Sequence, residues 1–123
     1  LLVNPRMPLA TPEVFAARRG PYSVVTPVPS MWPDLAGLVG ALVERGNDLT
    51  EAAISLRPAI ADVLAALGRT EGARYAAMSG SGATCFALYD DTAAARRAAD
   101  RPVATTADPP HSLAVSGRRL RGR

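Results

Sequence analysis

Apolar residues recur at helical spacing in the middle of the chain. Between residues 34 and 46 they occupy every third or fourth position, which is typical of a helix with one core-facing side. Asp34 is a favourable N-cap residue for this helix, and Gly46 is a favourable residue to end it. The predicted core stripe consists of Leu35, Leu38, Val39, Leu42 and Val43.

Two further helices are predicted between residues 47 and 68. Because proline does not fit deep inside a helix, Pro58 separates them and opens the second. The first starts with the capping pair Asn47 and Asp48, and Gly68 ends the second. The residues expected to face the core are Ala53, Leu56, Ile60, Val63, Leu64 and Leu67.

A shorter helix is expected near each end of the chain. Thr11 is interpreted as the cap of the first, with Pro12 at its first position, and the helix stops by Gly20. The other runs from the Asp90–Asp91 pair to about Arg101. Between the first helix and Asp34 lies a long loop with four prolines, in which Trp32 is expected to anchor the chain to the core.

Strand-like runs are predicted at residues 1–4, on both sides of a turn within 73–89, and more weakly at 111–116. Without the inserted helices, the order is that of a ferredoxin-like fold. We therefore expect an α+β domain with a mostly antiparallel sheet and helices on one face.

The turn between the two central strands is rich in glycine and hydroxyl groups. Glycine adopts positive φ without the penalty that other residues meet, so such a loop can direct several N–H groups at an anion. A glycine-rich hairpin without a ligand is an equally good interpretation of the local chemistry. The candidate phosphate or substrate residues are Ser79, Gly80, Ser81, Gly82, Ala83 and Thr84.

Two familiar nucleotide motifs are excluded at this turn. A P-loop ends in Gly-Lys-Ser/Thr and leads into a helix, whereas this chain contains no lysine. A dinucleotide-binding fingerprint needs a third glycine where Cys85 stands, and it also precedes a helix.

Composition describes a small globular domain with a nearly neutral body. The chain has 123 residues, of which 48% are hydrophobic and 5% aromatic, so its core must be mostly aliphatic. The net charge of +3 comes from four arginines in the last six residues. Because no basic stripe appears elsewhere, this tail predicts a solvated end and no nucleic-acid partner.

The single Cys85 excludes an internal disulfide and a cysteine-based metal cluster. It is interpreted as a small core residue, which fits a cytoplasmic protein. Neither a membrane-spanning stretch nor a signal peptide is visible, so no membrane partner is expected. Since Leu1 opens directly on a strand-like run, we expect the chain to begin partway through a larger protein.

No catalytic set is predicted within the chain. His111 is the only histidine and has no assignable partner or neighbouring metal ligand, so no metal site is expected. Asp48 is a conceivable general base, but a helix-capping role is the better interpretation. Arg96 and Arg97 are interpreted as the solvated face of their helix.

Three segments together resemble the C-terminal domain of the GHMP small-molecule kinases. These are Val3-Asn4-Pro5 with Thr11-Pro12-Glu13-Val14-Phe15, then Asn47-Asp48-Leu49-Thr50-Glu51-Ala52-Ala53, and Met78-Ser79-Gly80-Ser81-Gly82-Ala83-Thr84-Cys85-Phe86. The last resembles the third motif of the family. Similarity extends to about Asp100, and Arg6 stands where a glycine is commoner.

The resemblance implies an ATP-dependent kinase that needs Mg²⁺ and phosphorylates an alcohol. Within the family, the chain is most similar to members that act on the C2 hydroxyl of a diphosphocytidyl sugar alcohol in non-mevalonate isoprenoid biosynthesis. The ATP-cradling loop of such kinases lies in an N-terminal domain, which is absent here. We thus expect a domain core at 1–101, with a loop, last strand and tail at 102–123.

Two alternatives remain open from the sequence. One is another small-molecule kinase of the same family. The other is a non-catalytic ferredoxin-like module that binds a regulator or forms a homodimer, for which an exposed edge strand at residues 1–3 would be suited.

Overall fold

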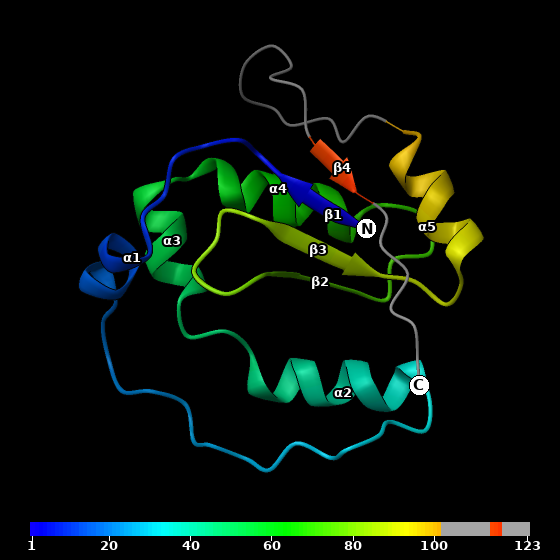
Figure 1. Cartoon of the computed structure of the whole chain (residues 1–123), viewed down its shortest axis with the longest axis horizontal. Coiled ribbons are helices and arrows are strands. Elements are labelled where there is room, and N and C mark those ends of the chain that lie inside the picture. The colour runs from blue at the N-terminus through cyan, green and yellow to red at the C-terminus, as the bar shows by residue number, and fades with distance from the viewer. Residues whose placement is uncertain (102–113, 117–123) are drawn as a thin grey trace.

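An antiparallel sheet organises the chain (Figure 1). The computed structural model describes residues 1–101 and 114–116. Within these residues the sheet has four strands in the order β2-β3-β1-β4. The strands are β1 (Leu2–Asn4), β2 (Tyr75–Met78), β3 (Cys85–Leu88) and β4 (Ala114–Ser116). This order, with every neighbouring pair antiparallel, confirms the ferredoxin-like α+β prediction.

Strand β1 lies inside the sheet, which corrects the expectation of an edge strand there. Val3 is opposite Cys85 of β3 on one side and Val115 of β4 on the other. Its backbone groups are thus paired on both sides, and β2 and β4 form the edges of the described sheet. Self-association through an exposed β1 is not available to this fold.

The core lies between one face of the sheet and the helices that cover it. Alternate strand residues point into it, because successive side chains of a strand face opposite sides. Helix α4 (Ala59–Gly68) supplies the largest share, with α3 (Thr50–Leu56) and α1 (Thr11–Ala17) beside it. The buried cluster is Val3, Val14, Ala52, Ala53, Ile60, Val63, Leu67, Met78, Ala83, Cys85 and Ala87. The predicted aliphatic core is confirmed.

The predicted caps Asp34 and Asp91 are confirmed, whereas Thr11 does not occupy the cap position of α1. The Asp34 carboxylate accepts a hydrogen bond from the Gly37 amide at 2.7 Å, at the start of α2 (Leu35–Arg45). Asp91 similarly accepts from Ala94 at the start of α5 (Thr92–Ala99). Helix α1 instead has Ala10 at its cap position. The hydroxyl of Thr11 is engaged elsewhere, so it does not close this helix.

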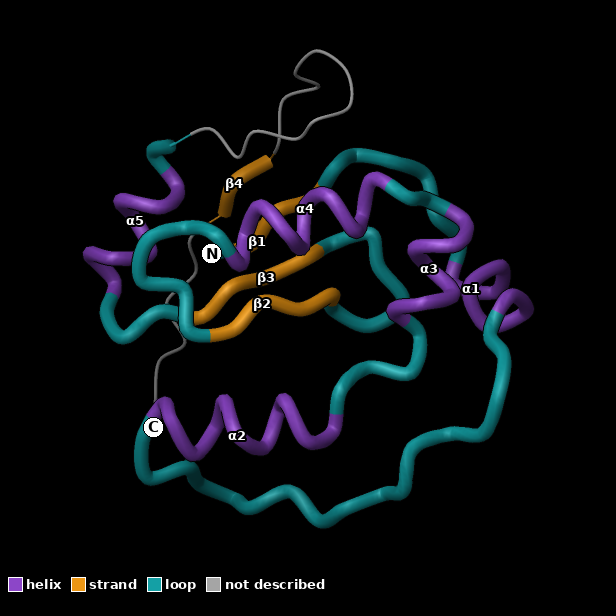
Figure 2. Tube along the Cα trace, turned by 180° about the vertical axis from the view of Figure 1, so that it is seen from behind, coloured by secondary structure: helices purple, strands orange, loops and turns teal. Residues whose placement is uncertain are grey.

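Helix α2 forms where the hydrophobic spacing predicted it, but it does not enter the core. Within the described part of the chain, none of its residues is buried, and Val43 is 65% exposed. Both views show α2 apart from the sheet, beside β2 (Figures 1 and 2). One link between them is the Tyr75 hydroxyl, which donates to the Leu42 carbonyl at 3.4 Å.

Residues 20–33 form the predicted loop, although Trp32 does not anchor it to the core. The Arg45 guanidinium lies 6.0 Å from the centroid of the Trp32 ring, so the indole packs on α2 instead. The predictions for residues 102–113 and 117–123, including His111 and the arginine tail, lie outside the described residues. No helix in the described ranges is long and apolar enough to cross a membrane.

Candidate phosphate-binding loop

The glycine-rich turn connects β2 to β3 and adopts the backbone that its glycines predict. Gly80 has φ +57° and Gly82 has φ +88°, and both values favour glycine. The turn is closed by two backbone hydrogen bonds, from Ser79 to Thr84 at 2.8 Å and from Gly82 to Ser79 at 3.0 Å. The strands on either side therefore hold a short, defined loop at the end of the sheet.

Four backbone N–H groups of this loop have no acceptor within the described protein. The amides of Gly80, Ser81, Ala83 and Thr84 donate to no group among the described residues. Ser79 and Gly80 are exposed to solvent. Ser81 and Thr84 are half-buried, whereas Ala83 belongs to the buried core. Because an accessible amide satisfies itself with water or with an anion, Gly80, Ser81 and Thr84 are the candidate donors to a phosphate group.

Gly82 is also favoured by packing. A Cβ atom at this position would lie 2.8 Å from the Met78 Sδ and 3.3 Å from the Leu9 Cδ2. Met78 is itself buried, so its side chain has little room to move away. A Cβ at Gly80, in contrast, would meet nothing within 4 Å.

Asn4 fixes the hydroxyl group at the end of the loop. Its Oδ1 accepts a hydrogen bond from the Arg6 amide at 2.7 Å, so its Nδ2 is the atom that faces Thr84. That Nδ2 donates to the Thr84 Oγ1 at 2.8 Å. The Thr84 hydroxyl thus accepts from Asn4 and keeps its own proton for another acceptor. On the other side of the loop, the hydroxyls of Thr11 and Ser81 are 2.8 Å apart.

Asn47 supports the loop, a role that sequence reasoning missed. Its Nδ2 donates to the carbonyls of Met78 at 3.1 Å and Gly80 at 2.9 Å, while its Oδ1 accepts from the Leu49 amide. The sequence interpretation placed Asn47 in a helix cap, and the bond to Leu49 agrees with that in part. Its contact with a loop 33 residues away has no local signal in the sequence.

Asp48 neither caps α3 nor lies in the loop. Its carboxylate accepts hydrogen bonds from the Ser23 hydroxyl and, at 2.8 Å, from the Ser23 amide. The hydroxyl bond first, then the amide bond, lowers the pKa of Asp48 below its ordinary value of 3.8. A carboxylate stabilised in its charged form is a poorer proton acceptor, so these bonds favour a structural role over that of a general base.

Cys85 is a core residue, as the sequence predicted. It is fully buried, and burial raises the pKa of its thiol to about 11. The protonated thiol is not the nucleophilic form at neutral pH. Over the ranges that the structure describes, no three histidine, cysteine, aspartate or glutamate side chains are grouped to hold a metal ion.

Comparison with known proteins places the loop in a family context. A sequence model described as "GHMP kinases C terminal" matches residues 33–105, a range that includes the loop. A 4-diphosphocytidyl-2-C-methyl-D-erythritol kinase of Paramagnetospirillum magneticum is 50% identical over 99 residues, which are 80% of this chain and 35% of that protein. The protein of the same name from Rhodospirillum rubrum is 40% identical, covering 94% of this chain and 42% of its own length.

A third protein of that name, from Paracoccus denitrificans, is 48% identical over 95% of this chain and 42% of its own length. The chain thus spans between about a third and two-fifths of the length of these relatives. No solved structure matches the chain significantly. Because the family match covers more than half of its residues, the chain belongs to the GHMP kinases and represents their C-terminal region.

Proposed function

We propose that the chain is the C-terminal part of a 4-diphosphocytidyl-2-C-methyl-D-erythritol kinase. In this proposal, the whole protein transfers the γ-phosphoryl group of ATP to the C2 hydroxyl of that sugar alcohol in non-mevalonate isoprenoid biosynthesis. The observation that carries the proposal is the set of relatives with this name, which are 40–50% identical over most of the chain.

The glycine-rich loop is proposed to line the active site and support the phosphate groups. Its unpaired amides and the Thr84 proton offer neutral donors to negatively charged oxygen. Phosphoryl transfer depends mainly on positioning and electrostatic stabilisation. A loop that only donates hydrogen bonds therefore contributes without any proton transfer of its own. The residues proposed to line this site are Ser79, Gly80, Ser81, Gly82, Ala83 and Thr84. Among them, the Ser79 and Gly82 amides close the turn and hold its shape, so they are not counted as donors to the ligand.

ATP and Mg²⁺ are proposed to bind mainly to an N-terminal domain of the same polypeptide. The present chain has no lysine with which to neutralise a transferring phosphoryl group. Residues 1–101 then form the core of the C-terminal domain and 102–123 its last strand and tail. The loop would face the nucleotide across the boundary between the two domains.

The test is a phosphorylation assay on the protein encoded by the complete open reading frame. We expect ATP- and Mg²⁺-dependent phosphorylation of 4-diphosphocytidyl-2-C-methyl-D-erythritol, and little turnover of homoserine or mevalonate. Turnover of a different alcohol alone would indicate another small-molecule kinase. Absence of turnover with all three alcohols, together with a ligand-independent dimer by light scattering, would favour a non-catalytic module.

A further inference from the structure

Five large apolar side chains are exposed close together on the long loop between α1 and α2. We call this segment, residues 22–31, the apolar loop. Val25 is 93% exposed and Val24 is 87% exposed, while Tyr22, Val28 and Met31 are all at least 65% exposed. No charged residue occurs between residues 20 and 33. So large an uncharged apolar segment marks an interaction surface on a water-soluble domain.

The apolar loop is held in place although its side chains point outward. The Ser23 amide donates to Asp48 at 2.8 Å, and an Arg45 Nη2 donates to the Pro27 carbonyl at 2.7 Å. At its start, the Arg18 guanidinium lies 3.5 Å from the centre of the Tyr22 ring. Both views show this segment running along the outside of α2 (Figures 1 and 2). Its exposure therefore belongs to a fixed conformation.

Fixing ten residues in an extended conformation costs conformational entropy, which burial of apolar surface normally offsets. Within the described residues, the apolar side chains of this loop obtain little such burial. A partner surface that covers them would supply it. Because the loop is uncharged, the surface it fits is apolar, in contrast to the basic groups that bind nucleic acid or the cationic groups that bind anionic lipid.

We propose that the apolar loop packs against the N-terminal domain of the same polypeptide. This inference rests on the proposed function, since it takes the rest of the kinase as the partner. The matched relatives are more than twice as long as this chain, and the family region that it matches is C-terminal. Most of such a protein thus precedes this domain and is available to cover the loop.

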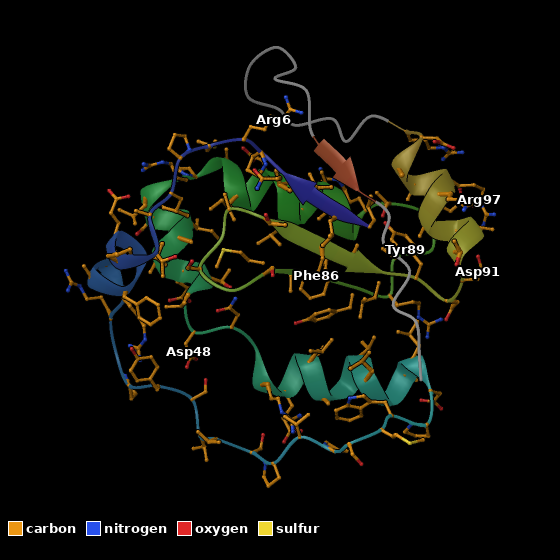
Figure 3. The ribbon with its side chains drawn as sticks, viewed as in Figure 1. Arg6, Asp48, Phe86, Tyr89, Asp91 and Arg97 are labelled. Atoms are coloured by element: carbon orange, nitrogen blue, oxygen red, sulfur yellow. The ribbon has the colours of Figure 1, made fainter. Side chains whose placement is uncertain are left out.

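The same contact would connect the domain boundary to the phosphate-binding loop. Asp48 holds Ser23 of the apolar loop, and its neighbour Asn47 holds the carbonyls of Met78 and Gly80. Two adjacent residues therefore anchor both loops (Figure 3 labels Asp48). A domain that packs against the apolar loop would therefore lie close to Asn47, the residue that holds the phosphate-binding loop.

Cysteine accessibility in the complete protein tests the proposal. Val25→Cys and Val28→Cys are made singly, and each is labelled with a thiol reagent in the native protein. Arg97→Cys is the matched control, because Arg97 is exposed on α5, away from the apolar loop (Figure 3). Cys85 is fully buried and contributes little background. The labelling rate of each variant in the native protein is divided by its rate in urea, which corrects for differences in the intrinsic reactivity of each cysteine.

We expect both loop positions to react at least tenfold more slowly than the control, at every protein concentration. Rates within threefold of the control would overturn the proposal. Protection that disappears on hundredfold dilution would also overturn it, because the occupant would then be a second copy. The readout is independent of activity: a protected loop in an inactive protein contradicts only the proposed function, and a reactive loop in an active kinase contradicts only this inference.

Discussion

Gly82 is favoured both by its backbone conformation and by its close neighbours, whereas Gly80 is favoured by its backbone conformation alone. Both have positive φ, but only at Gly82 would a side chain collide with Met78 and Leu9. Gly82→Val should therefore destabilise the protein by about 2–4 kcal/mol, because strain and overpacking add. Gly80→Val, which meets only the backbone strain, should cost about 1–2 kcal/mol. Urea unfolding of the two variants measures the difference.

The kinetic consequence tests the role of the loop. If the loop supports the phosphates as proposed, Gly82→Val should lower kcat/KM of the complete protein at least about tenfold, because its displaced amides would no longer reach them. Unchanged kinetics in a folded Gly82→Val protein would argue against a site role for this loop. Equal stability of the two valine variants would contradict the packing argument.

Arg6 adopts a backbone conformation that favours glycine. Its φ is +54°, in the left-handed region where a Cβ atom is costly. The family resemblance seen in the sequence implies a glycine more often than an arginine at this position. Arg6→Gly should be about 0.5–1 kcal/mol more stable than Arg6→Ala, because both lose the side chain but only glycine relieves the backbone. Equal unfolding free energies would contradict this.

Burial of Cys85 makes stability depend on alkaline pH. The pKa of its thiol rises from 9.0 to about 11 in the folded protein. Between pH 9 and 11 the unfolded state releases a proton that the folded state retains. The contribution of the buried thiol to the free energy of unfolding is therefore fully present below pH 9 and is lost as the pH rises. From pH 8 to 10.5, the wild type should lose about 2 kcal/mol more than Cys85→Ala. Parallel pH profiles in urea unfolding would contradict the prediction.

At the level of elements, the junction between α2 and α3 positions the candidate phosphate-binding loop. Asn47→Asp replaces the donor to two carbonyls with an oxygen that repels them, while the acceptor for Leu49 is kept. It should cost about 1–3 kcal/mol and lower kcat/KM in the complete enzyme. Asp48→Asn is the control, and because it keeps an acceptor for Ser23, it should cost under about 1 kcal/mol.

These two variants are measured side by side by urea unfolding and steady-state kinetics. A larger kinetic loss in Asp48→Asn than in Asn47→Asp would show that the loop does not depend on Asn47. The two variants are well matched because the residues are adjacent and the substitutions are opposite. Asn47→Asp replaces an amide with a carboxylate, and Asp48→Asn replaces a carboxylate with an amide.

Most of the elements were predictable because their signals are local. Asp34 and Asp91 cap their helices, and the strands on either side of the turn pair as the alternating burial requires. The positive φ values of Gly80 and Gly82 are also of the kind that glycines in a tight turn between two strands favour. The fold class then follows from the order of the elements, since few topologies suit it.

What the sequence did not reveal depends on contacts between distant segments. The stripe on α2 indicates which side of the helix is apolar, but not whether the core reaches it, and no α2 residue in the described structure is buried. Asn47 and Asp48 have the same capping preference, yet they bind two different loops. Such partners, 25 to 33 residues away in the chain, leave no periodic pattern.

For the whole molecule, the proposed division of labour predicts that the chain by itself is inactive. Its candidate contribution is a set of neutral hydrogen-bond donors, and the described part has no grouped carboxylates to hold Mg²⁺. Residues 1–123 should therefore give no detectable ATP-dependent phosphorylation under conditions in which the complete protein turns over. A coupled assay for ADP release measures both proteins.

The inactivity is informative only if the domain is folded, so far-UV circular dichroism and urea unfolding accompany the assay. A cooperative transition with no ADP release fits the proposal, because the donors are then formed but the nucleotide-binding half is missing. Measurable turnover by residues 1–123 would place the catalytic groups inside this chain. The proposed division of the active site between two domains would then be wrong.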